Sequence, residues 1–143
     1  MGDLLMKTSS SIYRFIRTSI AIGSIALFFN TVTVQASDHE SECFNSVQGK
    51  IPWNDEKNMN WEPKNVKQLC AGTTKPAEPG ACFLSVLDGR VNWGKGVSWD
   101  WQNIINLCAG TNNAKNTVEC FQNATGKGLD WRDAILFCQR ADK

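Results

Sequence analysis

Six cysteines recur along this chain in a pattern that constrains its fold more than any other feature. They form three pairs, each with an opening and a closing member: Cys43 and Cys70, Cys82 and Cys108, and Cys120 and Cys138. Each opening cysteine is followed by Phe, and the opening cysteines recur at periods of 39 and 38 residues. A period in this range is typical of tandem structural repeats.

The pattern divides the chain into three repeats, at residues 43–73, 82–111 and 120–138. The sequence Leu-Cys-Ala-Gly-Thr at 69–73 is identical to that at 107–111, so the first two repeats end in the same way. The third repeat lacks the middle stretch of the other two. We therefore expect it to be an atypical terminal cap of a small repeat array.

The N-terminal segment has the layout of a secretory signal peptide. Three basic residues precede an apolar run of 11 residues at 19–29. Val34 and Ala36 then stand at the −3 and −1 positions of a cleavage site after Ala36. This layout predicts a signal peptide at 1–36 that is cleaved after Ala36, and a three-repeat domain at 37–143. The alternative is an uncleaved N-terminal anchor, but the run is shorter than the about 20 residues that span a bilayer. We expect no stable membrane span after cleavage.

Export and an even number of cysteines predict a disulfide framework in the periplasm or outside the cell. A zinc site would need close cysteine pairs, which the sequence does not contain, so we expect no metal and no cofactor. The net charge is +1, and it becomes −1 once the signal with its three basic and one acidic residues is removed. This balance argues against a nucleic-acid partner.

The local patterns predict an all-α fold of three tandem disulfide-stapled helical hairpins packed as a small array. After each opening cysteine, apolar residues stand at helical spacing, as at Cys82, Phe83 and Val86. We expect these first helices to start at the opening cysteines and to end at three glycines: Gly49, Gly89 and Gly126. The second helices are expected to begin near three residues suited to a helix start: Pro63, Ser98 and Asp130.

An antiparallel hairpin places the start of its first helix beside the end of its second, which is where the opening and closing cysteines stand. In the third repeat the two helices are expected to be of equal length. We therefore predict disulfides within each repeat: Cys43–Cys70, Cys82–Cys108 and Cys120–Cys138. The rival arrangement would link neighbouring repeats: Cys70–Cys82, Cys108–Cys120 and Cys43–Cys138.

The repeated Cys-Phe and Leu-Cys-x-Gly-Thr motifs, with Asn92-Trp93-Gly94 before the second helix, resemble Cys-rich repeats of uncharacterised exported bacterial proteins. The resemblance covers residues 43–138 and implies an exported bacterial protein. It implies no activity. The first repeat departs from it, because Ile51-Pro52-Trp53 replaces the Asn-Trp-Gly sequence.

Six tryptophans are the strongest candidates for a function. Trp101 and Trp131 lie on the apolar stripes of second helices, so we predict that they are core residues. The connectors between helices offer polar and aromatic residues that could form a ligand-binding site: Trp53, Asn92, Trp93, Trp99 and Asp100. Such rings can stack on sugars or anchor a protein interface. The alternative is that the connector tryptophans only cover the ends of the hairpin core.

We therefore predict an exported, non-enzymatic binding protein whose ligand is a glycan or a protein of the envelope or host. One alternative is a disulfide-stabilised inhibitor or toxin that acts on another protein. A further alternative is a small hydrolase that uses Asp100 and a second carboxylate. No spacing in the sequence singles out a pair of carboxylates, so we assign no catalytic residue.

Overall fold

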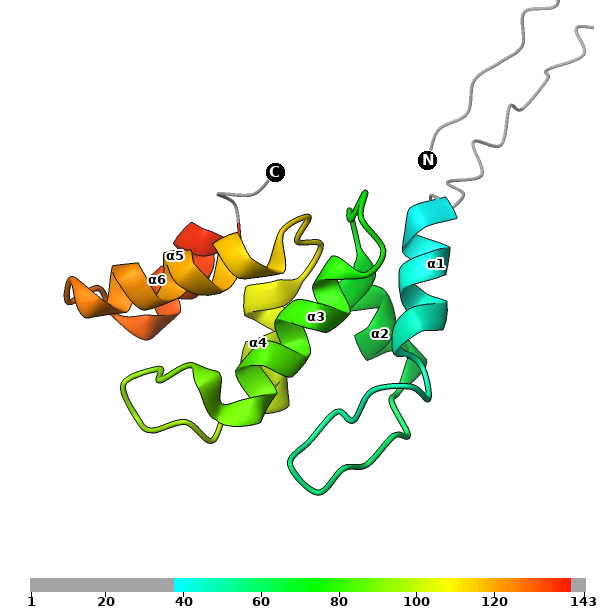
Figure 1. Ribbon diagram of the computed structural model, residues 1–143, viewed down its shortest axis with the longest axis horizontal. Coiled ribbons are helices and arrows are strands. Elements are labelled where there is room, and N and C mark those ends of the chain that lie inside the picture. Colours follow the sequence, from blue (N-terminus) through cyan, green and yellow to red (C-terminus); the bar gives the residue numbers. More distant parts are fainter. Residues whose placement is uncertain (1–37, 140–143) are drawn as a thin grey trace, which may run out of the picture. The chain divides into compact units, whose positions relative to one another are not determined.

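The computed structural model describes residues 38–139; the predicted signal peptide at 1–36 lies outside this range. These residues form six α-helices and no strand, which confirms the all-α prediction (Figure 1). A wide helical turn, η1 (Val86–Arg90), continues the third helix. The helices are α1 (Asp38–Val47), α2 (Pro63–Cys70), α3 (Glu78–Ser85), α4 (Trp101–Cys108), α5 (Ala114–Gly126) and α6 (Trp131–Cys138).

The helices form three hairpins that stack side by side in two layers. The first helices of the hairpins, α1, α3 and α5, contact one another in sequence, and so do the second helices, α2, α4 and α6. Each hairpin contacts its neighbour, so α3 and α4 lie between the two end hairpins (Figure 1). The two long connectors, residues 48–62 and 91–100, lie along the same edge of the array.

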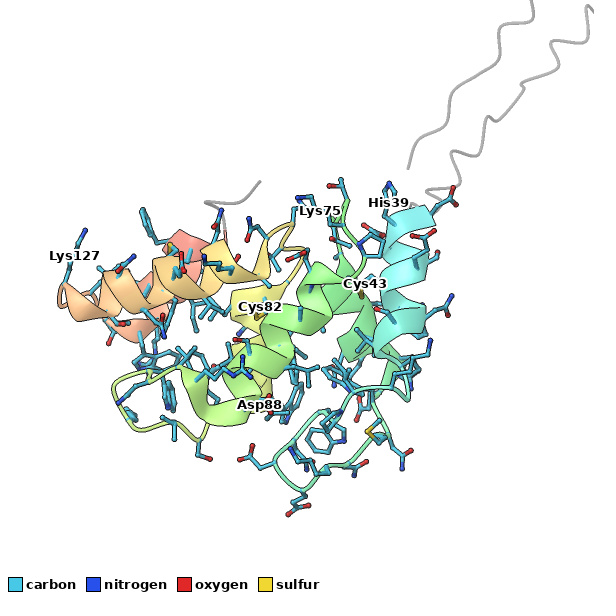
Figure 2. The ribbon with its side chains drawn as sticks, viewed as in Figure 1. His39, Cys43, Lys75, Cys82, Asp88 and Lys127 are labelled. Atoms are coloured by element: carbon cyan, nitrogen blue, oxygen red, sulfur yellow. A yellow bond between two sulfur atoms is a disulfide. The ribbon has the colours of Figure 1, made fainter. Side chains whose placement is uncertain are left out.

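One disulfide links the two helices of every hairpin, as predicted, and the rival pairing between repeats is wrong. The bonds are Cys43–Cys70, Cys82–Cys108 and Cys120–Cys138, with Cα–Cα distances of 5.7, 5.6 and 5.7 Å. Cys43 and Cys82 occupy equivalent places on α1 and α3 (Figure 2). On the chain-entropy model, closing loops of 18 to 27 residues contributes about 3 kcal/mol each to stability.

The first helices start earlier than predicted, so their cysteines lie inside the helices. In α3, Pro79 stands in the first turn, where its missing N–H costs nothing. In α5, the Asn113 side chain caps the helix by accepting a hydrogen bond from the N–H of Asn116 at 3.0 Å. As a result α5 has 13 residues and α6 has 8, and the expected equality of these two helices is wrong.

Two of the second helices, α4 and α6, begin directly after an aspartate whose side chain caps the helix. Asp130 accepts a hydrogen bond from the N–H of Arg132 at 2.9 Å, which confirms the predicted cap of α6. In α4 the cap is Asp100, which accepts from the N–H of Gln102 at 2.8 Å. The prediction of Ser98 as this cap is wrong, because its hydroxyl instead lies 3.3 Å from the Asp55 carboxylate of the preceding connector.

The two identical pentapeptides at 69–73 and 107–111 contact each other directly. The Gly110 N–H donates to the Leu69 carbonyl at 2.8 Å. The Thr73 hydroxyl donates to the Thr111 carbonyl at 3.2 Å. Gly110 has φ +66°, and a Cβ there would lie 2.2 Å from the carbonyl oxygen of Ala71. A glycine at 110 therefore sets how closely the first two hairpins approach.

A matched pair of alanine substitutions tests this contact. Gly72 has φ +81° but open space around it, so Gly72→Ala should cost only the left-handed backbone, about 1–2 kcal/mol. Gly110→Ala should lower the free energy of unfolding by about a further 1–3 kcal/mol, because its methyl group meets fixed backbone. Denaturant unfolding with the disulfides intact measures both. Equal losses in the two variants would show that the close approach is unimportant.

Candidate functional site

Trp61 and Trp99 are core residues in equivalent positions, nine residues before the closing cysteines. Their side chains are 4% and 6% exposed. Each indole N–H donates to a backbone carbonyl of its own connector at 2.8 Å, that of Trp61 to Ile51 and that of Trp99 to Val91. The prediction of Trp99 as a ligand-binding residue is therefore wrong, because its ring faces the interior of the protein.

Both buried tryptophans contact a phenylalanine of the next hairpin. The ring centroids of Trp61 and Phe83 lie 4.8 Å apart, and those of Trp99 and Phe121 lie 5.1 Å apart, each pair with an interplanar angle of 61°. The same edge-to-face contact thus forms at both junctions between hairpins. Such pairs add stability beyond their buried area.

The connector tryptophans Trp53 and Trp93 are half-buried, and each packs edge-to-face on the first-turn tryptophan of the next hairpin. The ring centroids are 6.0 Å apart for Trp53 and Trp101 and 4.6 Å apart for Trp93 and Trp131. The alternative expectation, that the connector rings cover the core, describes these contacts. Trp101 and Trp131 are themselves only half-buried, so their prediction as core residues is wrong. They lie at the rim because Trp61 and Trp99 fill the interior.

Asn92 and Asp100 have local structural contacts. The Asn92 side chain accepts a hydrogen bond from the Gly94 N–H at 2.8 Å and thereby closes a turn in the connector. Asp100 caps α4. Asn92 also lines an open hollow of about 500 Å³ beside Gln122 of the next hairpin. The structure thus brings Trp93 and Trp99 together, 5.5 Å apart, but it does not gather the five predicted residues into one site.

Two clefts, which we call the junction clefts, lie where neighbouring hairpins meet. Each contains the first-turn tryptophan of one hairpin and the asparagine that stands five residues before the closing cysteine of the preceding hairpin. The first, of about 120 Å³, is lined by Trp53, Asn60, Trp61, Glu62, Asn65 and Trp101. The second, of about 450 Å³, is lined by Asn103, Asn106, Trp131, Arg132, Ile135, Leu136 and Gln139.

Amide side chains of α2 and α4 connect the junction clefts, and we call this group the amide strip. The Asn106 side-chain oxygen accepts hydrogen bonds from the Gln68 and Gln102 amides, both at 3.2 Å. The side-chain amides of Asn65 and Asn103 make no hydrogen bond to another described residue. The strip consists of Asn65, Gln68, Gln102, Asn103 and Asn106. Sequence reasoning missed it, although the matching positions of Asn65 and Asn103 in their repeats offered a signal.

The two clefts differ in charge. In the second, the Arg132 guanidinium lies over the Trp131 ring, 4.3 Å from its centroid, and 3.9 Å from the Asp130 carboxylate. It therefore covers part of this indole by a cation–π contact. Within residues 38–139 no cation lies over Trp101.

Within residues 38–139, no three His, Cys, Asp or Glu side chains lie close enough together to hold a metal ion. None of the described helices is long and apolar enough to cross a membrane.

Comparisons of the chain with protein-family models, with curated proteins and with solved structures find no match. The resemblance to exported bacterial repeats therefore stays a prediction.

The two neighbouring indoles Trp93 and Trp99 allow a matched test of the buried hydrogen bond. Trp99→Phe leaves the Val91 carbonyl without its partner, whereas the Trp93 N–H is buried and has no partner to lose. Both changes remove similar ring area, so Trp99→Phe should lower the free energy of unfolding by about 1–3 kcal/mol more than Trp93→Phe. Thermal or denaturant unfolding measures the difference. Equal destabilisation would contradict the assignment of Trp99 as the hydrogen-bonded core ring.

Proposed function

We propose that this protein is an exported, non-catalytic binding protein that recognises a glycan at its junction clefts and along the amide strip. The observation that supports this most is the recurrence of one arrangement at both junctions. In each cleft a half-buried indole, Trp101 or Trp131, lies beside an asparagine, Asn65 or Asn103, whose side-chain amide has no hydrogen-bond partner among the described residues.

The chemistry of these side chains matches a polyhydroxylated ligand. An amide carries both donors and acceptors, so it can pair with hydroxyl groups whichever way they point. A half-exposed indole offers an apolar face with a polar tip, which suits the apolar face of a sugar ring. Two clefts on one chain, each with the same pair of a tryptophan and an asparagine, would favour a ligand with repeated units, because the second contact forms at high effective concentration.

The roles within the first cleft follow from its lining. Trp101 provides the stacking face, and Trp53 supports it from the connector of the preceding hairpin at 6.0 Å. Asn65 and Asn60 supply amides, and the Glu62 carboxylate accepts hydrogen bonds. Of the residues first predicted from the sequence, Trp53 is the one that keeps a place at this proposed site.

Two alternatives from the sequence have less support. The hydrolase would use Asp100, whose carboxylate instead caps α4 at 2.8 Å. The inhibitor or toxin would need a protein-binding surface, and the junction clefts do not support it, because neither has the continuous apolar lining that protein anchors occupy. A pull-down from envelope or host extracts tests that second alternative separately.

Asparagine-to-alanine variants test the glycan proposal with little risk to folding. We expect the protein to bind one or more polysaccharides on a glycan array. Asn65→Ala and Asn103→Ala should each weaken binding about three- to tenfold, the worth of one hydrogen bond. Calorimetric titration with the polysaccharide found on the array measures the loss. Trp101→Ala should weaken binding further, because it removes the stacking face.

The matched control is Asn116→Ala on α5, since Asn116 is exposed and lines neither junction cleft. It should bind like the wild type. Circular dichroism must show that the compared variants are folded. An array without any bound glycan, or unchanged affinity in both cleft variants, would refute the proposed function.

Export is part of this proposal. Three disulfides are in keeping with an oxidising compartment. We expect cleavage after Ala36, so that the exported chain begins at Ser37. Intact-mass and N-terminal sequencing of the protein recovered from the periplasm or medium check this. A full-length chain retained in the membrane fraction would instead support the uncleaved anchor.

A further inference from the structure

The contact between neighbouring hairpins is built twice from the same positions. The phenylalanine after the opening cysteine of the later hairpin, Phe83 or Phe121, packs on the buried tryptophan of the earlier one. The residue before the closing cysteine of the earlier hairpin, Leu69 or Leu107, is fully buried as well. Each junction therefore has two different sides. We call the later hairpin with its phenylalanine the donor side, and the earlier hairpin with its tryptophan the acceptor side.

The acceptor side occurs a third time, uncovered, on the last hairpin. Leu129 stands at the position of Trp61 and Trp99, and Phe137 at the position of Leu69 and Leu107. Leu129 is 41% exposed and Phe137 63% exposed, because no described helix packs on them. Together with Ala124 they line a hollow of about 730 Å³, which we call the trailing face.

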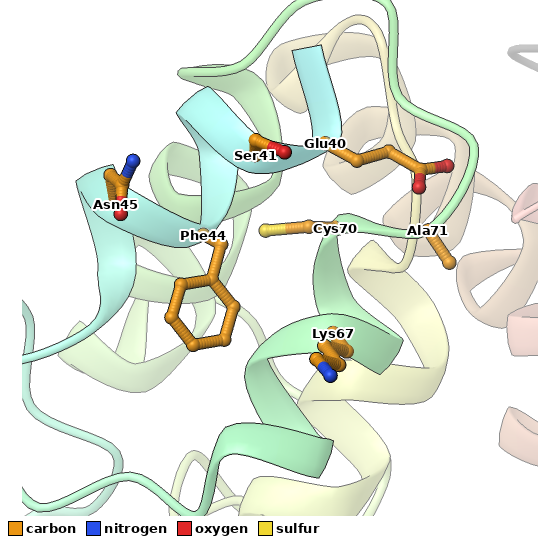
Figure 3. Close-up of a pocket in the computed structure, with 7 residues that line it drawn as sticks. All are labelled: Glu40, Ser41, Phe44, Asn45, Lys67, Cys70 and Ala71. Carbon is orange, nitrogen blue, oxygen red and sulfur yellow. The ribbon is translucent and has the colours of Figure 1, made fainter. Parts of the chain in front are cut away.

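The donor side also occurs a third time, on the first hairpin. Phe44 of α1 stands at the position of Phe83 and Phe121, and it lines a hollow of about 550 Å³ with Ser41 and Lys67 (Figure 3). We call this the leading face. His39 of α1 and Lys127 beside the trailing face mark the two opposite ends of the described array (Figure 2).

We propose that the leading face of one copy of this chain docks on the trailing face of a second copy. In this head-to-tail contact, Phe44 of one copy packs on Leu129 and Phe137 of its neighbour. Continuity with the established junctions identifies the occupant: each side of the missing contact is present on the chain, in the same register as the two contacts already formed. No other partner is needed to supply a matching surface.

The leading face is more polar than its counterparts, so the contact is weaker than the junctions inside the chain. Lys67 stands where the later hairpins have Ile105 and Ile135. The Glu40 carboxylate accepts the Gly72 N–H, whereas the equivalent Gly110 N–H bonds to the preceding hairpin. Docking must therefore proceed without that backbone hydrogen bond. We expect association that rises with protein concentration and disappears on dilution.

Because the two faces differ, each added copy leaves one face of each kind open. A contact of this type extends into a chain of copies or closes into a ring, and it does not stop at a symmetric dimer. The alternative arrangement, two trailing faces packed on each other, would stop at a dimer and would not involve Phe44.

Two variants block one face each without removing a core side chain. Ser41 is exposed, and its counterpart Gly80 is so close to the preceding hairpin that an added Cβ would lie 3.4 Å from Val47. Ser41→Arg should therefore block the leading face by its bulk. Phe137→Glu places a charge on the trailing face. The control is Val97→Glu, since Val97 is 51% exposed on a connector and belongs to neither face.

Sedimentation velocity over a range of concentrations tests the proposal on the protein as the cell produces it, with its disulfides intact. The wild type and Val97→Glu should show an average mass that rises with concentration beyond that of a dimer. Ser41→Arg and Phe137→Glu should each remain monomeric. An equal mixture of these two should form a dimer and nothing larger, because it contains one intact leading face and one intact trailing face.

Other results overturn the proposal. A wild-type protein that is monomeric at every concentration would show that the faces do not associate. If Ser41→Arg still dimerises while Phe137→Glu does not, the trailing faces pair with each other. If the mixture stays monomeric although the wild type associates, the contact is not head-to-tail. Because none of these variants lies in a glycan-contacting position, glycan binding and self-association can fail independently.

Discussion

Each hairpin of this protein depends on one covalent link between its two helices. The helices are short, and α2, α3, α4 and α6 have only eight residues each, a length at which an isolated helix is marginal in water. The disulfide joins the interior of the first helix to the last residue of the second. It thereby holds the apolar faces of the pair together, while the contact with the next hairpin covers the remaining side.

Cysteine spacing and apolar residues at helical spacing were enough to predict three helical hairpins and their disulfides, because each closing cysteine is the last residue of its helix. The start of each first helix was not predictable from the opening cysteine. It depends on Pro79 and Asn113, which lie upstream in stretches without helical periodicity. Local signals place a helix, but its first turn is set by a residue that caps the free N–H groups, such as Asn113, or that lacks an N–H itself, such as Pro79.

The candidate site was harder to predict, because burial here is decided by the neighbouring hairpin. Helical spacing placed Trp101 on the apolar stripe, whereas Trp99 was predicted to be a ligand-binding residue of the connector. In the structure Phe121 covers Trp99, and Trp101 remains at the rim with Trp53. A pattern within one repeat contains no information on which face the next repeat covers. The amides of the junction clefts are likewise ordinary surface residues in the sequence, and only their shared position in two repeats distinguishes them.

The placement of the disulfides also has a mechanical consequence. Tension applied between α1 and α6 would pass through the three disulfides. The loops that they close, between cysteines up to 27 positions apart, would not bear this tension and could not extend. Only the spans between bridges, from Cys70 to Cys82 and from Cys108 to Cys120, could lengthen. Extension of the array along its covalent path is thus confined to these two spans, and force would act first on the contacts between hairpins.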